Sequence, residues 1–308
     1  MTVLKKQRKL FKRLRKRVIK ITNHPLTKDK PFDAVKRYAR FHLVHKLLPG
    51  AAVYPFVNDL KILTRPGMGY VAHNIYVGLG DYWEMGFVLH FLRSADVFVD
   101  VGANAGAYSL LAAGVCQAAV IAIEPVPETY KLLQLNLKLN NLEDKVECMN
   151  IGAGDATSRL HFSIDKPDAW NRVVIKPEEM AKAIVVDVYP LDQIVAKACP
   201  ALLKIDVEGY DFAVLKGATN ILQNPGLKAV LVELNKNGRR FGFSETDIHK
   251  LLLDACFQPY AYDPMTRKLT QLSNYNQKEE NTLYLRDLNF VRDRVENAAP
   301  FHVLGQDI

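Results

Sequence analysis

From residue 82 onward, short apolar runs alternate along the chain with segments whose apolar residues recur at helical spacing. The runs predict strands over residues 97–101, 119–123, 145–150, 201–205 and 228–233, and two more near 257–262 and 282–286. The segments between them predict helices over 82–93, 105–115, 127–140, 191–198, 210–217 and 245–255. Continuous apolar strands are typical of parallel sheets covered on both faces. The alternation therefore predicts an α/β fold around a doubly wound, mostly parallel sheet.

Residues 157–188 interrupt this alternation. They predict two strands of alternating polarity, 159–164 and 184–188, around a polar insert. The insert contains three residues that can cover a substrate, Trp170, Asn171 and Arg172. Aromatic faces bind sugar rings, although a single Trp is equally explained by packing. We expect this segment to be an acceptor-side insertion.

The two ends of the chain follow other patterns. Residues 32–48 predict a helix, residues 51–80 are punctuated by Gly and Pro and predict short strands, and the last twenty residues show no clear period. We therefore divide the chain into four parts: an arm (1–22), a lead-in segment (23–80), a main domain (81–290) and a C-terminal tail (291–308).

The positive charge is concentrated in the arm. Residues 1–20 contain ten Lys or Arg and no acid, and subtracting them from the net charge of +8 leaves −2. A basic body would indicate a nucleic-acid groove, whereas a basic end indicates an appended element. Apolar residues recur at helical spacing between the cations: Leu4, Phe11, Leu14, Val18 and Ile21. A basic amphipathic helix of this kind can lie on an anionic membrane surface; the alternative is a solvated, partly disordered arm.

Several protein classes are disfavoured by composition. No run of 18 apolar residues is present, and the N-terminus lacks the apolar core of a secretory signal. The four cysteines are scattered without a C-x-x-C pair, so neither a zinc site nor a disulfide framework is indicated. We expect a cytoplasmic protein, either free or peripheral to a membrane.

A glycine turn follows the first strand of the main domain in V-D-V-G-A-N-A-G, residues 99–106. The dinucleotide fingerprint G-x-G-x-x-G fits poorly, because Asn104 and Ala107 stand where its second and third glycines are required. The turn still brings backbone close to a ligand, without a pyrophosphate clamp. A nicotinamide dinucleotide enzyme is therefore disfavoured.

Two acids follow the next strands. Glu124 ends the second strand, where a carboxylate accepts hydrogen bonds from the ribose of any adenosyl ligand; the alternative is an acid at a helix N-terminus. Asp155, in I-G-A-G-D-A, can face the adenine of the same ligand or simply serve the turn.

The fourth strand of the main domain ends in L-L-K-I-D-V-E-G-Y-D, residues 202–211. In a doubly wound sheet this strand neighbours the first, and ligands bind between their carboxyl ends. Lys204, Asp206 and Glu208 should therefore converge on the glycine turn. Three charged groups at the end of a buried strand need partners or a role. The alternative is an ion pair followed by a helix cap.

These motifs together resemble the FkbM family of S-adenosylmethionine-dependent methyltransferases. The resemblance spans residues 80–235 and rests on V-F-V-D-V-G-A-N-A-G, I-E-P-V-P, G-A-G-D, V-Y-P-L-D, L-L-K-I-D-V-E-G-Y-D and V-E-L. It implies the Rossmann-like class I fold, with seven mostly parallel strands and a last antiparallel hairpin. It also implies S-adenosyl-L-methionine as methyl donor and methyl transfer to oxygen, often on a sugar or natural product.

The resemblance also implies roles for individual residues. By position, Asp100, Gly102, Asn104 and Gly106 line the methionine end of the donor, Glu124 its ribose and Asp155 its adenine. Asp206 falls beside the reacting methyl group, and Glu208 and Glu233 line the acceptor side. We expect catalysis to rest on Lys204, Asp206 and Glu208.

If the acceptor is a hydroxyl, a base must remove its proton. Asp206 and Glu208 are the local candidates. His73 and His161 are more distant ones, and for each of them an ordinary structural role is favoured. Oxygen ligands from Asp206, Glu208 and Glu233 suit Mg²⁺ or Ca²⁺, but we expect no metal.

The sequence predicts a methyltransferase acting on a hydroxylated small molecule or glycan. A nucleic-acid methyltransferase that uses the basic arm is one alternative, disfavoured by the net negative body and by the lack of an N-P-P-Y-type motif after strand four. A non-catalytic adenosyl-binding or membrane-docking protein is the other.

Overall fold

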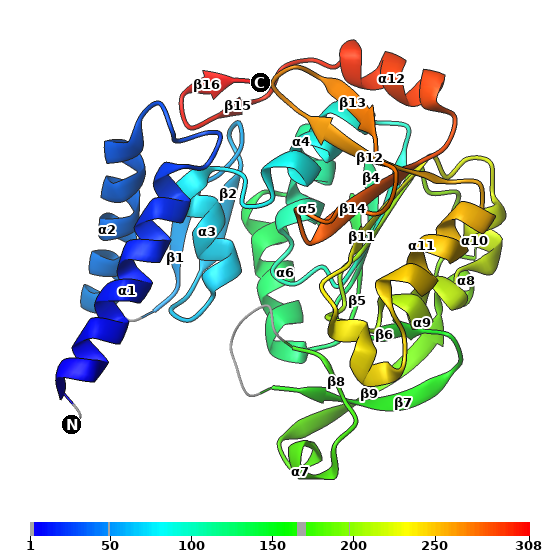
Figure 1. Cartoon of the computed structure of the whole chain (residues 1–308), viewed down its shortest axis with the longest axis horizontal. Helices are drawn as coiled ribbons and strands as arrows, with labels where there is room; N and C mark the ends of the chain where they lie inside the picture. The colour runs from blue at the N-terminus through cyan, green and yellow to red at the C-terminus, as the bar shows by residue number, and fades with distance from the viewer. Residues whose placement is uncertain (1–2, 49, 165–170, 197) are drawn as a thin grey trace.

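The computed structural model describes residues 3–48, 50–164, 171–196 and 198–308, with side chains from Phe11 onward. Within these residues the central sheet has eight strands in the order β13-β12-β14-β11-β10-β3-β4-β5 (Figure 1). Five are parallel: β3 (Val97–Val101), β4 (Ala119–Ile123), β5 (Val146–Met149), β10 (Leu202–Ile205) and β11 (Ala229–Glu233). The antiparallel edge consists of β14 (Asn281–Leu285), β12 (Gln258–Asp263) and β13 (Lys268–Gln271).

The predicted α/β sheet and its antiparallel end are confirmed, with one strand more than expected. The additional strand β13 pairs with β12, where Tyr262 faces Leu269. Its burial is low along most of its length, so the apolar run that marks the other strands is missing. β10 lies beside β3 with Ile205 opposite Val101, as the doubly wound order predicts.

Helices cover both faces of the sheet, because alternate strand residues point to opposite sides. Phe98 and Val120 belong to one core, and Val99 and Ile121 belong to the other. Helices of the first core are α4 (Tyr82–Phe91), α5 (Ala107–Leu110), which continues as a π-helical turn over Leu111–Val115, and α6 (Pro127–Leu139). Helices of the second core are α8 (Leu191–Ile194), α9 (Asp211–Lys216), α10 (Thr219–Gln223) and α11 (Glu245–Asp254).

The N-terminal part forms a helical layer beside the sheet domain (Figure 1). Its elements are α1 (Val3–Thr22), α2 (Pro31–Leu47), β1 (Ala52–Pro55), β2 (Lys61–Thr64) and α3 (Gly69–Val77). α1 packs on α2, and α2 packs on α3. The arm is thus a helix anchored at its end by the buried Ile21, while Phe11 and Leu14 are exposed. The Leu4 side chain lies outside the described residues.

Asparagine side chains join the lead-in segment to α6. Asn136 accepts the amide of Leu63 at 2.6 Å, and Asn140 accepts that of Lys61 at 2.8 Å. These bonds satisfy the free edge of β2, which a two-stranded sheet would otherwise leave open. The helix α3 in this segment was not predicted, since residues 51–80 indicated only strands.

The insertion forms a second sheet in the order β6-β9-β7-β8. Its strands are β6 (Gly152–Gly154), β7 (Ser158–Ser163), β8 (Val173–Val174) and β9 (Ala183–Pro190), and α7 (Pro177–Met180) connects the last two. The two predicted strands are confirmed as β7 and β9, which pair antiparallel.

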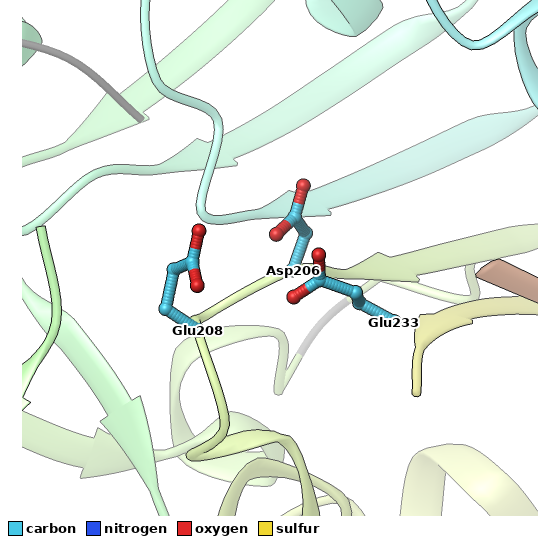
Figure 2. Close-up of side chains that lie close together, drawn as sticks. All are labelled: Asp206, Glu208 and Glu233. Carbon is cyan, nitrogen blue, oxygen red and sulfur yellow. The ribbon is translucent and has the colours of Figure 1, made fainter. Parts of the chain in front are cut away.

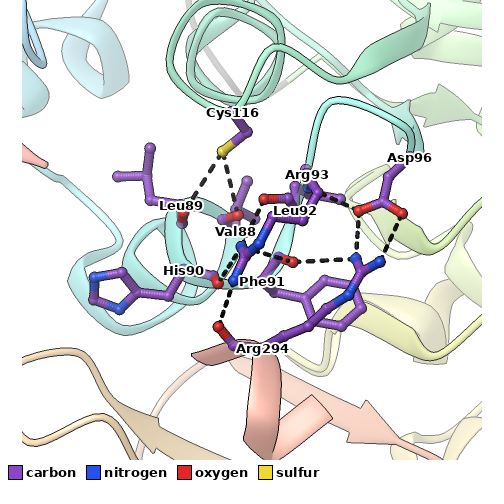
Figure 3. Close-up of polar contacts among 9 residues, drawn as sticks. All are labelled: Val88, Leu89, His90, Phe91, Leu92, Arg93, Asp96, Cys116 and Arg294. Atoms are coloured by element: carbon purple, nitrogen blue, oxygen red, sulfur yellow. Dashed lines mark hydrogen bonds and ion pairs between the residues drawn. The ribbon is translucent and has the colours of Figure 1, made fainter. Parts of the chain in front are cut away.

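The C-terminal residues are ordered into elements that the sequence pattern did not indicate: α12 (Leu288–Glu296), β15 (His302–Val303) and β16 (Gln306–Asp307). Figure 3 shows how α12 is held: the Arg294 guanidinium contacts both carboxylate oxygens of Asp96, one of them at 3.2 Å. Arg93 donates to the carbonyls of His90 and Leu92 at 2.8 and 2.9 Å and to that of Arg294. α12 also buries Val291 and Val295, one turn apart, but nine residues give only a short apolar period in the sequence.

Among the described residues, no helix combines the length and apolar character that crossing a bilayer requires.

Candidate functional site

A cavity of about 870 Å³ lies at the carboxyl ends of the parallel strands. Its walls come from the segments after β3, β4, β10 and β11 and from the three N-terminal helices. This is the ligand position expected of a doubly wound sheet. The helical layer therefore contributes directly to the site, which the sequence pattern did not indicate because the arm reads as an appendage.

The glycine turn is shaped by its contact with the neighbouring motif. Gly102 has a φ of +78°, and a Cβ atom on it would overlap the backbone carbonyl oxygen of Asp206. Asn104 also has a positive φ, and Gly106 is the left-handed residue that directly precedes α5. Gly102 and Asn104 line the cavity, whereas Gly106 packs against Leu133 outside the lining. Only part of the predicted donor turn therefore faces the cavity.

Glu124 ties this turn to the end of β4. Its two carboxylate oxygens accept the backbone amides of Asn104 at 3.0 Å and Val126 at 2.9 Å. The side chain is 5% exposed and lines the cavity. Burial raises the pKa of Glu124 to about 7, and the two amides oppose that rise. Each oxygen retains a further lone pair for a ligand.

Asp100 lies beneath the cavity and is not part of its lining. It accepts the Ser109 hydroxyl at 2.7 Å and lies 3.7 Å from the Lys204 ammonium. Burial raises the pKa of Asp100, against the attraction of Lys204. The structure thus gives Asp100 a supporting position behind the glycine turn, whereas the resemblance implied contact with the donor.

Lys204 connects the two carboxylates of neighbouring strands. Its Nζ lies 3.3 Å from Asp206 and 3.7 Å from Asp100, and 4.9 Å from the centre of the Tyr108 ring. Burial disfavours the ammonium, but the attraction of Asp206 and Asp100 outweighs it and raises the pKa of Lys204. Lys204 is therefore a fixed cation that orients Asp206.

Three carboxylates meet where β10 and β11 end. Figure 2 shows Asp206, Glu208 and Glu233 directed toward a common space, and their oxygens lie within 4.8 Å of one another. Burial raises the pKa of Glu208 to about 7, with a further contribution from Asp206. Burial and the same neighbouring acids raise the pKa of Glu233 well above its ordinary value. Protonation of these carboxyl groups relieves the repulsion among them. Carboxylate oxygens at this spacing also suit Mg²⁺ or Ca²⁺.

Asparagines hold two of these acids in place. Asn235 donates to Glu233 at 2.6 Å, and Asn237 donates to Glu208 at 3.0 Å. Both asparagines belong to the segment after β11 and line the cavity. They were not predicted, because no motif marks them.

A buried tyrosine–aspartate group forms another part of the lining. The hydroxyls of Tyr70 and Tyr108 donate to the same oxygen of Asp81 at 2.7 and 3.1 Å. Burial raises the pKa of Asp81. In the sequence, Asp81 is recognisable only as the residue before a predicted helix, α4. An Asp at that position predicts a helix cap, so nothing in the sequence indicated that Asp81 lines the cavity.

The remaining predicted residues divide between the cavity and the surface. His73 and Asn171 line the cavity, and burial lowers the pKa of His73 to about 4. His161 lies in β7, outside the lining, and Arg172 pairs with Glu179 at 3.1 Å. Trp170 lies outside the described residues.

Asp155 does not reach the cavity. It follows β6 of the inserted sheet and forms an ion pair with Lys216 at 2.9 Å on the surface. The sequence placed it after the third strand of the main sheet, but that strand ends at Met149 and the chain has already entered the second sheet.

The family model described as a methyltransferase FkbM domain matches residues 100–262, more than half of the chain. The chain belongs to the FkbM methyltransferase family. This FkbM protein is 28% identical over 234 residues to the hexuronic acid methyltransferase AglP of Haloferax volcanii; the match covers 72% of the chain and 89% of that relative. It is 29% identical over 160 residues to the methyltransferase sdnD of Sordaria araneosa; this match covers 41% of the chain and 61% of that relative. The solved FkbM methyltransferase of Methylobacillus flagellatus KT has 18% identity and a TM-score of 0.43, covering 82% of this chain and 60% of its own.

Proposed function

We propose that this FkbM methyltransferase uses S-adenosyl-L-methionine to methylate a hydroxyl group on a sugar, glycoconjugate or natural product. The observation that carries the proposal is that one cavity is lined by the glycine turn and Glu124 and also by the carboxylates of Asp206, Glu208 and Glu233. The name of the Haloferax relative, a hexuronic acid methyltransferase, supports a sugar as acceptor.

The donor half of the cavity fits an adenosyl ligand without phosphate. Gly102 contributes its backbone to the cavity lining, and Glu124 is a buried carboxylate with lone pairs free for two ribose hydroxyls. S-adenosylmethionine, when bound, supplies an electrophilic methyl group on a cationic sulfur. Acids suit that charge, and nothing in the turn is built to clamp a pyrophosphate.

The acceptor half supplies a base. Glu208 has a pKa near 7, so its carboxylate is available at neutral pH and is basic enough to accept a proton from a hydroxyl. The acceptor oxygen forms its bond to the methyl carbon as the carbon–sulfur bond breaks, and the hydroxyl proton passes to Glu208. Lys204 fixes Asp206 beside this group, so most of the rate enhancement comes from positioning and electrostatics.

Calorimetry tests the donor assignment. S-adenosylmethionine and S-adenosylhomocysteine should bind, while NAD should give no heat; the reverse pattern would refute the proposal. Donor turnover with a panel of sugars, sugar acids and nucleic acids then tests the acceptor. Turnover with sugars supports the proposal, and turnover with nucleic acid alone favours the alternative that the basic arm recognises a polynucleotide.

We also propose that α1 and α2 attach the protein to an anionic membrane surface. Phe32, Leu43 and Leu47 are exposed, at spacings that place them on one face of α2, opposite the buried Ala34 and Phe41. α1 adds an exposed Phe11 at 70% and much of the basic charge of the arm. Apolar side chains among cations are typical of helices that lie in a membrane interface.

Vesicle sedimentation tests this attachment. The protein should bind vesicles containing phosphatidylserine, less so at high salt, and not vesicles of phosphatidylcholine alone. Changing Phe32, Leu43 and Leu47 to Ser should abolish binding, whereas Val185→Ser, an exposed apolar residue on the inserted sheet, should leave it intact. Equal binding to both vesicle types would refute the electrostatic part.

A further inference from the structure

One wall of the cavity has a chemistry different from that of the donor and acid regions. It is formed by Arg17, Lys20 and Ile21 of α1, Tyr38, Phe41 and His42 of α2, and His73 and Tyr76 of α3. No carboxylate belongs to this set. The other charged lining groups are mainly acids, and they come from other segments: Asp81, Glu124, Asp206, Glu208, Glu233 and Glu280. The cavity is therefore cationic and aromatic on one wall and acidic on another.

The two cations of this wall lack acidic partners within the described part of the chain. Arg17 and Lys20 are three residues apart on α1, so their side chains share a face. Neither takes part in a salt bridge between described residues, whereas Lys204, the other cation of the lining, contacts both Asp100 and Asp206. Their charge is thus available to a ligand.

The neighbouring histidines, His42 and His73, add no positive charge to this wall. Burial, then the charge of Arg17, lowers the pKa of His42, and burial with a contribution from Lys20 lowers that of His73 to about 4. Both imidazoles are neutral at pH 7. An anion that enters this wall therefore meets Arg17 and Lys20 as its only full charges there.

Aromatic rings lie beside the two cations. Tyr76 packs edge-on against Tyr38 and Phe41, with ring centres 5.0 and 5.3 Å apart, and its hydroxyl lies 3.5 Å from the His42 ring nitrogen. Ring faces that carry polar edges are suited to the alternating CH and hydroxyl groups of a sugar. Cations next to such rings favour a sugar that bears a negative group.

We propose that Arg17 and Lys20 bind an anionic group, a carboxylate or a phosphate, on the acceptor, so that the natural acceptor is an acidic sugar or glycan. This inference rests on the proposed methyl transfer and specifies its substrate. The anion lies at the α1 wall, and this directs a hydroxyl of the same molecule toward Asp206 and Glu208. The N-terminal helix is then a specificity element of the enzyme as well as a surface feature.

Matched acceptors and matched variants test the proposal in the full-length protein. The acceptors are methyl glucoside, methyl glucuronide and glucose 6-phosphate, which differ in charge while keeping the ring. The test variant is R17Q/K20Q. The control is R13Q/K16Q, which removes the same charge from the same helix at positions outside the cavity lining.

We expect the wild type to prefer an acidic acceptor over methyl glucoside. Comparing methyl glucuronide with glucose 6-phosphate then shows whether the preferred anion is a carboxylate or a phosphate. R17Q/K20Q should lower kcat/KM for the acidic acceptor by about 10- to 100-fold, through KM, and change that for the neutral glucoside by less than about 3-fold. R13Q/K16Q should match the wild type. Equal use of neutral and acidic acceptors by the wild type, or an equal loss for both in R17Q/K20Q, would overturn the inference.

Saturation-transfer NMR separates failure of this inference from failure of the proposed function. It detects binding of the glucuronide or the phosphate without any turnover. If methyl transfer is absent but the acidic sugar binds wild type and not R17Q/K20Q, the anion site stands and the methyltransferase proposal fails. If methyl transfer occurs and binding is the same in both proteins, the anion site fails alone.

Discussion

Gly102 lies directly against the backbone carbonyl of Asp206, so closely that any side chain at position 102 would overlap it. This contact joins the donor turn after β3 to the acidic motif after β10. The two strands are hydrogen-bonded neighbours, and Asp206 donates its amide to Val101 at 3.0 Å. The two halves of the site therefore form one rigid unit.

Replacing Gly102 by Ala should disrupt this unit. The methyl group would displace the Asp206 carbonyl, and the φ of +78° is strained for any L side chain, at about 1–3 kcal/mol. We expect donor affinity measured by calorimetry to fall more than about 10-fold. Gly242→Ala is the matched control, because Gly242 has a φ of +82° with open space around it. Similar losses in both variants would assign the effect to backbone strain alone.

Donor binding should depend on pH through Glu124. Burial raises the pKa of Glu124 to about 7, and only its carboxylate form accepts hydrogen bonds from both ribose hydroxyls. Affinity should therefore weaken as the pH falls through 7 and level off only above about pH 8, with the Kd for S-adenosylhomocysteine as the measurement. Glu124→Gln should bind weakly at every pH. A wild-type affinity that is flat from pH 5.5 to 8 would contradict the ribose role.

The acidic motif should separate binding from turnover. Asp206→Asn and Glu208→Gln should retain donor affinity within about 3-fold and lose kcat by about 10²- to 10⁴-fold, the range expected for a general base. In the wild type, kcat should fall as the pH drops below 7, because Glu208 becomes protonated. Unchanged turnover in Glu208→Gln would show that Glu208 is not the general base and would leave Asp206 as the remaining local candidate.

Protein stability should decrease as the carboxylates ionise. Glu208 and Asp211 both have pKa values raised to about 7 by burial, so the folded state holds their protons more tightly than the unfolded chain. Their stabilising contribution is present at pH below about 4.5 and is lost as the pH rises through 7. Tm should therefore fall as the pH is raised from about 4.5 through 7, because the folded protein must release these two buried protons.

Glu208→Gln tests the same repulsion directly. It should raise Tm at pH 8, where the wild-type Glu208 is ionised, and leave Tm unchanged at pH 5, where that carboxyl is protonated. The exposed Glu178→Gln should change neither value. We expect turnover to withstand EDTA, since protons and Lys204 already balance the cluster. Loss of activity that Mg²⁺ restores would show that a cation lies among these oxygens instead.

The C-terminal segment should contribute to global stability through Arg294 and Asp96. Their side chains are only 19% and 10% exposed, and removing one partner leaves the other charge without compensation. Asp96→Asn and Arg294→Gln should each lower the free energy of unfolding by about 2–4 kcal/mol in urea titrations. The exposed pair Lys250–Asp254 is the control, and Asp254→Asn should cost less than about 1 kcal/mol. Equal effects would mean that α12 is not integral to the fold.

The elements of the main domain could be predicted from sequence because their signals are local. β3 and β4 were predicted with the bounds that the structure has, since both are mainly apolar runs, broken only by Asp100, that end before Gly102 and Glu124. The prediction that β3 and β10 lie side by side in the sheet followed from the right-handed winding of strand–helix units. For the same reason the pattern of strands and helices was enough to place Lys204 and Asp206 beside Gly102.

Other parts depended on contacts between distant segments. α12 is held by Arg294 on Asp96, nearly 200 residues earlier, and its apolar face is limited to Val291 and Val295 within nine residues. β13 pairs only at the sheet edge and is mostly exposed, so it has no apolar period. Asp155 was misplaced because the switch from the main sheet to the inserted sheet occurs within three residues after Met149. No local pattern distinguishes that switch from a turn.

The sequence by itself determined the α/β class, the glycine turn and the charged residues after the fourth strand, because spacing along one strand or helix decides which side chains share an end or a face. Only the tertiary structure decided what completes the cavity. Asp81 meets Tyr70 and Tyr108, and Arg17 and Lys20 enter from the N-terminal helix, through the packing of α1 on α2 and of α2 on α3. Packing between helices depends on the fit of whole surfaces, which the local order of residues does not express.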